Sequence, residues 1–176
     1  MAYAYDDPRA HDLRDAYHAA FGGERFPVPV EAIAEDLLGL AVETRNDLQV
    51  SGMLLPAERR IIVRSDESAV RRRFTIGHEL GHWICQCLEG DMRPVYCRAA
   101  EIGVDLEAKA LEREANVFAA NLLMPEDVVR TAWSTAATVQ AVASLFDVSS
   151  EAMEWRLYNC GFVSERPAPP AADARD

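Results

Sequence analysis

The stretch RRFTIGHELGHWIC, from Arg72 to Cys85, contains the pattern HExxH, with His78 and His82 four residues apart and Glu79 between them. On an α-helix, side chains four residues apart lie on the same face, one turn apart. Both imidazoles can therefore reach one metal ion, and zinc accepts neutral imidazole nitrogens in a tetrahedral ligand set. The pattern predicts a Zn²⁺ site on a helix, with Glu79 as the general base that takes a proton from an attacking water molecule.

Two glycines, Gly77 and Gly81, each directly precede one of the histidines and lie four residues apart in the same helix. Glycine inside a helix costs about 1 kcal/mol relative to alanine, so two of them need a reason. Together they leave a strip without side chains beside the histidines. We expect a second helix to approach along this strip and to bring the third protein ligand.

Cys85 is the local candidate for that ligand, since it shares a helical face with His78. Seven residues of helix rise about 10 Å, however, and this separation is too large for both side chains to bind one ion. Cys85 is therefore interpreted as a buried thiol.

The segment DLEAKALEREANVFAANLLM, residues 105–124, predicts a second helix that carries Glu107, Glu112 and Glu114. Glu112 and Asn116 are four residues apart and share a face, so Asn116 can accept a hydrogen bond from a ligand histidine. Glu114 points about 200° away from Glu112 around the helix. The spacing favours Glu112 as a ligand but leaves Glu114 open.

The residues before the motif predict two short helices, at 9–21 and 27–39, and three strands, at 40–45, 49–55 and 60–64. The strands are expected to form a small antiparallel sheet, and Ser65 is expected to cap a helix over 66–88. The strand QVSGMLL (49–55) is a candidate exposed edge that could hold an extended substrate, with Gly52 permitting close approach. Tyr96 and Arg98 are candidates for stabilising an oxyanion.

The C-terminal stretch TVQAVASLFDVSSEAMEWRLYNCGF, residues 138–162, resembles a helix-turn-helix. It raises an alternative function, a DNA-binding transcriptional regulator in which the zinc site is regulatory or structural. Between residues 126 and 162, however, five acidic residues face only two basic ones, and the net charge of the chain is −11. Groove binding needs several phosphate contacts, so direct nucleic-acid binding is not expected.

The 176-residue sequence contains no apolar run of membrane-spanning length and no secretory signal, which predicts a cytoplasmic protein without a membrane partner. Its four cysteines form no CxxC pair and are expected to be reduced thiols. The expected fold class is α+β, with the small antiparallel sheet packed on the HExxH helix and the ligand helix. The predicted division is a core over 1–125, a helix-turn-helix-like helical subdomain over 126–163, and a disordered tail over 164–176.

The pair of motifs RRRFTIGHELGHWI (71–84) and EREANVFAANLLMP (112–125) resembles the ImmA/IrrE family of zinc metallopeptidases, over about Val50 to Phe162. The resemblance implies a gluzincin-like core in which His78, His82 and Glu112 bind zinc. It also implies endopeptidase activity against a helix-turn-helix (XRE-like) repressor, whose cleavage relieves repression in mobile elements or stress responses. A metal-binding protein that no longer cleaves is a further alternative, but the sequence retains Glu79.

Overall fold

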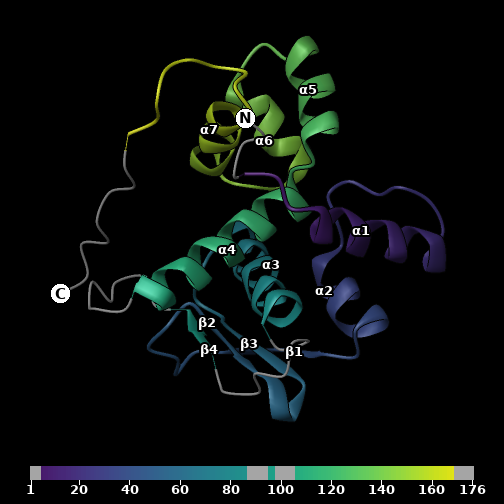
Figure 1. The fold of residues 1–176 in the computed structure, drawn as a ribbon, viewed down its shortest axis with the longest axis vertical. Coiled ribbons are helices and arrows are strands. Elements are labelled where there is room, and N and C mark those ends of the chain that lie inside the picture. The colour runs from purple at the N-terminus through teal and green to yellow at the C-terminus, as the bar shows by residue number, and fades with distance from the viewer. Residues whose placement is uncertain (1–4, 87–94, 98–105, 169–176) are drawn as a thin grey trace.

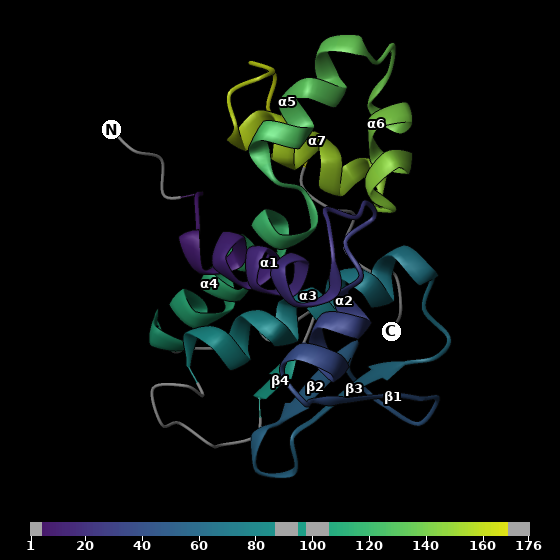
Figure 2. The same cartoon turned by 90° about the vertical axis from the view of Figure 1, so that its right-hand side faces the viewer.

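A computed structural model of the protein describes residues 5–86, 95–97 and 106–168, without the side chains of 95–97 and 107. Within these ranges a small sheet lies at one end of the molecule (Figure 1). Helix α3 (Ala69–Cys85) lies against the sheet, and α4 (Leu106–Leu123) packs on α3. The C-terminal helices gather at the opposite end from the sheet (Figure 2): α5 (Glu126–Thr135), α6 (Val139–Phe146) and α7 (Ser150–Asn159). The α+β fold class predicted from the sequence is confirmed.

The sheet contains β1 (Ala41–Arg45), β2 (Gly52–Leu55), β3 (Arg60–Arg64) and β4 (Val95–Cys97), in the order β1-β3-β2-β4. Strands β2 and β3 form the expected antiparallel hairpin through the turn η2 (Pro56–Glu58). Strand β1 instead pairs in parallel with the free edge of β3, so the sheet is mixed rather than antiparallel throughout. The prediction that residues 49–55 form an exposed edge is wrong, because β4 covers the other side of β2.

The N-terminal half contributes α1 (Pro8–Phe21) and α2 (Val30–Ala32), and the chain continues from α2 into the π-helical turn η1 (Ile33–Leu37). These elements match the helices expected at 9–21 and 27–39. Asp7 caps α1 by accepting a hydrogen bond from the backbone N–H of Arg9 at 3.0 Å. Gly39 has a positive φ of 63°, which ends the second helical segment before β1.

Helix α3 (Ala69–Cys85) begins later than expected, since Ser68 rather than Ser65 is its N-cap. Asp66 and Glu67, the first residues of the expected range, precede the helix: Asp66 pairs with Arg64, and Glu67 accepts a hydrogen bond from Ser51 at 2.7 Å. The expected helix end at residue 88 lies outside the described residues. The side chains of Ile76 and Leu80 are fully buried in the core.

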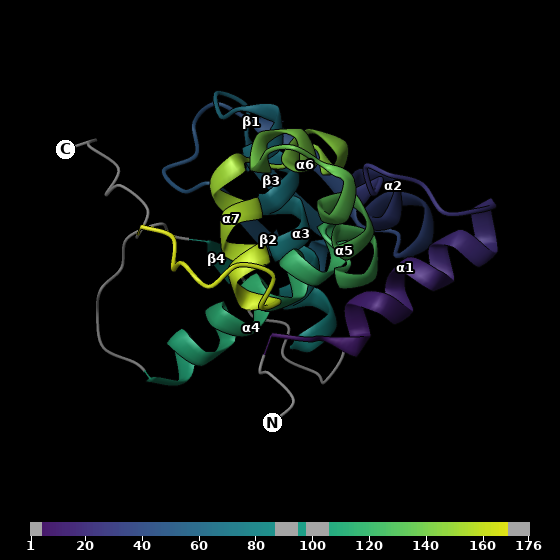
Figure 3. The same ribbon diagram turned by 90° about the horizontal axis from the view of Figure 1, so that it is seen from above.

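Helix α4 (Leu106–Leu123) follows the predicted range closely, and Pro125 stands at the start of α5 (Glu126–Thr135). The helix-turn-helix-like segment forms α6 (Val139–Phe146) and α7 (Ser150–Asn159), with Asp147 in the left-handed conformation between them. Viewed from above, these helices lie over α3 (Figure 3). One continuous cluster of buried side chains includes residues on both sides of residue 125, and the division into core and subdomain stays a prediction.

Two arginines connect these C-terminal helices to the rest of the chain. Arg73 of α3 pairs with Asp147 at 3.2 Å. Arg156 of α7 is buried, and it donates to the backbone carbonyl of Met124 and to the side-chain oxygen of Asn121, both at 2.8 Å.

Among the described residues, no helix is long and apolar enough to cross a bilayer.

Candidate metal centre

The two histidines of α3 lie on its buried face. His78 is 2% exposed and His82 is 1% exposed, and their Nε2 atoms are 2.9 Å apart. Their position follows from helical spacing, because residues four apart stack on one face and direct their rings the same way. The two Nε2 atoms therefore point to one location.

Glu112 of α4 completes a cluster of three possible ligands with these histidines. One carboxylate oxygen lies 3.3 Å from His78 Nε2, and the other lies 3.2 Å from His82 Nε2. Ligand atoms at about 2.1 Å from a tetrahedral zinc ion would be separated by about 3.4 Å, so these spacings are close to those of one face of such a site. Burial raises the pKa of Glu112, but its bonds to the two histidines outweigh burial and lower the pKa to about 2.

The second nitrogen of each imidazole also has a partner. His78 Nδ1 lies 3.0 Å from Asn116 Oδ1, so this nitrogen carries the hydrogen and Nε2 keeps its lone pair for a metal. The side-chain amide of Gln86 lies 2.7 Å from His82 Nδ1. When the amide oxygen faces the ring, it accepts the Nδ1 hydrogen of His82, as Asn116 does for His78. Gln86 was missed in the sequence, although its position four residues after His82 is a usable signal.

Gly77 and Gly81 both lie on the side of α3 that α4 approaches. A Cβ atom at Gly81 would lie 2.9 Å from the Cα of Ala115 and 3.0 Å from its carbonyl oxygen. At Gly77 a Cβ atom would lie 3.5 Å from the Cβ of Ala119, which is an ordinary contact. The predicted strip is therefore confirmed, and only Gly81 is strictly required by the backbone of α4. Figure 1 shows the two helices side by side.

Glu79, the candidate general base, is fully buried, and both of its carboxylate oxygens lack a hydrogen-bond partner among the described residues. Burial, and secondarily the charge of Glu112, raise the pKa of Glu79 well above its usual value. A cation held by the neighbouring cluster would offset both effects, because positive charge favours the carboxylate. The unpartnered carboxylate and the spacing of the three ligands both fit a metal ion at this position.

Gly52 lies directly behind this carboxylate. A Cβ atom there would be 2.3 Å from Thr75 Cγ2 and 3.2 Å from Glu79 Oε1. The sequence had suggested that Gly52 permits the approach of a substrate. The structure shows instead that it permits β2 to pack against α3.

The remaining candidates lie elsewhere. Glu114 pairs with Arg9 of α1 at 2.7 Å, so it is directed away from the cluster. Cys85 is buried and does not belong to the cluster. Arg98 lies outside the described residues, and the side chains of Tyr96 and Glu107 are not described.

Comparison with known proteins agrees with this geometry. The sequence profile of the IrrE N-terminal-like domain matches residues 39–158. Metallopeptidase ImmA of Bacillus subtilis (strain 168) is 27% identical over 127 residues, which cover 69% of this chain and 72% of that protein.

The solved structure of a Mycobacterium tuberculosis transcriptional regulator shares the fold, with a TM-score of 0.61 and 21% identity. The match covers 88% of this chain, but the chain spans only about half (49%) of that structure. The profile match covers more than half of the chain and includes both helices of the metal cluster. The chain therefore belongs to the Peptidase_M78 family of metallopeptidases, the family of the IrrE N-terminal-like domain.

Proposed function

We propose that the protein is a zinc-dependent endopeptidase in which His78, His82 and Glu112 hold the metal. The observation that carries this proposal is the convergence of two imidazole nitrogens and a carboxylate within 3.3 Å of one another. Two neutral imidazoles and one carboxylate leave a bound dication with a net positive charge. A zinc ion in this ligand set supplies Lewis acidity, which polarises a peptide carbonyl and acidifies water.

The other residues of the site have defined tasks in this proposal. Glu79 takes a proton from the attacking water and passes it to the nitrogen of the leaving amine, so that water is added across the C–N bond. Glu79 is buried, so bulk solvent is excluded from its carboxylate, and this favours the proton transfer. Asn116 holds the ring of His78 by accepting its Nδ1 hydrogen, and Gln86 holds the ring of His82.

We further propose a helix-turn-helix (XRE-like) repressor as the substrate, cleaved in the cytoplasm to relieve repression. Family membership and the name of the similar metallopeptidase support a protein substrate. The excess of acidic residues in the chain would favour a basic, DNA-binding partner through electrostatic complementarity.

The test is co-expression of the protein with the repressor encoded nearest to it, followed by gel analysis of that repressor. Glu79→Gln is the matched variant, since it keeps the size of the side chain and removes the base. Cleavage by the wild type alone is expected. Equal cleavage by Glu79→Gln would contradict the proposed mechanism.

The alternative is a DNA-binding regulator that uses residues 138–162, and its support is the fold shared with the Mycobacterium tuberculosis transcriptional regulator. The position of Arg156 argues against it. This is the only basic residue of α7, and it is buried in hydrogen bonds to the protein rather than available to phosphates. Retention of the protein on DNA at physiological salt would favour the alternative.

A further inference from the structure

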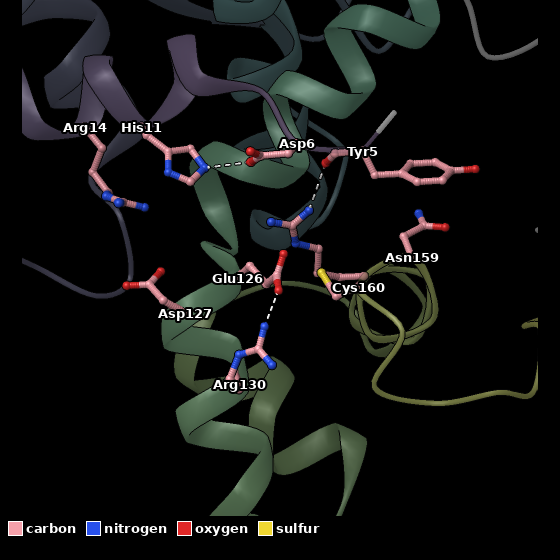
Figure 4. A pocket seen from close by; sticks show the side chains of 10 residues that line it. Tyr5, Asp6, His11, Arg14, Glu126, Asp127, Arg130, Asn159 and Cys160 are labelled. Carbon is pink, nitrogen blue, oxygen red and sulfur yellow. Dashed lines mark hydrogen bonds and ion pairs between the residues drawn. The ribbon is translucent and has the colours of Figure 1, made fainter. Parts of the chain in front are cut away.

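A pocket of about 680 Å³ lies between the start of α1, the first turns of α5 and the end of α7 (Figure 4). None of its lining residues belongs to the metal cluster. Ligand pockets in proteins commonly have volumes of roughly 300–1,000 Å³, so a small molecule would fit.

Arg14 of α1 lines this pocket and is only 5% exposed. Its Nε and Nη1 atoms have no hydrogen-bond partner among the residues that the structure describes. The carboxylate of Asp15 approaches its Nε only to 3.7 Å, and that carboxylate is largely in solvent. Buried guanidinium N–H groups that lack an acceptor are unfavourable, and they indicate that an anionic group from outside can complete the site.

Most other charged groups around the pocket already have partners: Glu126 pairs with Arg130, Asp6 with His11 at 3.2 Å, and Arg156 with the backbone carbonyl of Met124. Asp127 is exposed, and within the described ranges its carboxylate forms no hydrogen bond or ion pair. In Figure 4, Asp127 and Arg14 lie on the same side of the pocket. Two nitrogens of the buried Arg14 and the exposed carboxylate of Asp127 are therefore left without hydrogen-bond partners among the described residues.

We propose that this pocket binds a small zwitterion, whose anionic group pairs with Arg14 and whose cationic group pairs with Asp127. A guanidinium can bind a carboxylate through two parallel hydrogen bonds, and burial strengthens such a pair. The ligand would connect α1 to α5. Arg9 of α1 also pairs with Glu114 of α4. The bound ligand would therefore also stabilise the position of α4, the helix that carries Glu112. The proposal does not depend on the proposed peptidase activity.

Calorimetric titration of the full chain with glycine, γ-aminobutyrate and ε-aminocaproate tests the proposal, with acetate, phosphate and butylamine as singly functional probes. We expect at least one zwitterion to bind more tightly than every singly functional probe and to raise the melting temperature. Arg14→Met and Asp127→Asn should each weaken this binding by about tenfold or more. Asp12→Asn, on the exposed side of α1, is the matched control and should leave binding unchanged.

A second measurement separates a ligand-binding arginine from a structural one. Arg14→Met should not lower the melting temperature of the free protein, because it removes a buried charge that has no close partner. If this variant does not fold, Asp127→Asn decides, since its side chain is exposed. Failure of all three zwitterions to bind, equally tight binding of acetate or phosphate, or unchanged zwitterion binding by Asp127→Asn would each overturn the proposal.

Discussion

Substitution of Gly81 by alanine tests whether the contact between α3 and α4 sets the metal centre. The new Cβ atom would lie 2.9 Å from the Cα of Ala115, about 0.5 Å inside the 3.4 Å at which ordinary contacts begin. The obstacle is backbone, so α4 as a whole must shift. Overpacking of this kind costs about 1–3 kcal/mol, while replacing a helical glycine recovers about 1 kcal/mol. We expect a net loss of up to about 2 kcal/mol in the free energy of unfolding.

Glu112 lies three residues before Ala115 on α4, so the same shift would displace its carboxylate. Metal–ligand distances tolerate about 0.2 Å, so a shift of about 0.5 Å should weaken metal binding by roughly tenfold or more. Gly77→Ala is the matched control, because its Cβ atom would meet the Cβ of Ala119 at an ordinary 3.5 Å. Urea unfolding and competition with a chelator measure both effects. Equal stability and equal metal affinity in the two variants would refute the reasoning.

Three further substitutions follow from the same structure. Gly52→Ala should lower the free energy of unfolding by about 1–3 kcal/mol, because its Cβ atom would clash with the methyl group of Thr75. Thr75→Ser in the same chain removes that methyl group and should restore part of the loss, as measured by urea unfolding. Asn116→Ala removes the acceptor for the His78 Nδ1 hydrogen and should weaken metal binding by about 10–100-fold in chelator competition; unchanged affinity would contradict its role. Arg156→Ala leaves buried acceptors without a donor and should lower the free energy of unfolding by about 3–5 kcal/mol; a loss below about 1 kcal/mol would show that its hydrogen bonds contribute little.

Local spacing predicted the two histidines and favoured Glu112, and the family resemblance selected Glu112 over Glu114. The HExxH pattern fixes two side chains on one helical face, and the four-residue spacing of Glu112 and Asn116 fixes two more on the second helix. Gly77 and Gly81 indicated that the helices approach closely, although only the structure distinguishes their roles. Gly81 faces the backbone of α4, whereas Gly77 faces a side chain.

Features that depend on contacts distant in sequence were not predicted. The parallel pairing of β1 with β3 places β3 inside the sheet, and the pairing of β4 with β2 places β2 inside it. Strand patterns do not specify which strands become neighbours. The role of Gly52 was misassigned for the same reason, since its close neighbour Thr75 lies on another element. The pairing of Glu114 with Arg9 joins residues 105 positions apart, and no local pattern indicates it.

The most direct test of the central claim is the zinc content of purified protein by mass spectrometry, compared among the wild type, Glu112→Gln and Glu114→Gln. Both substitutions remove one carboxylate from the same helix, but only Glu112 lies at the histidines. We predict about one zinc ion per chain in the wild type and in Glu114→Gln, and a large loss in Glu112→Gln. Full zinc content in Glu112→Gln, or an equal loss in Glu114→Gln, would contradict the proposed metal centre.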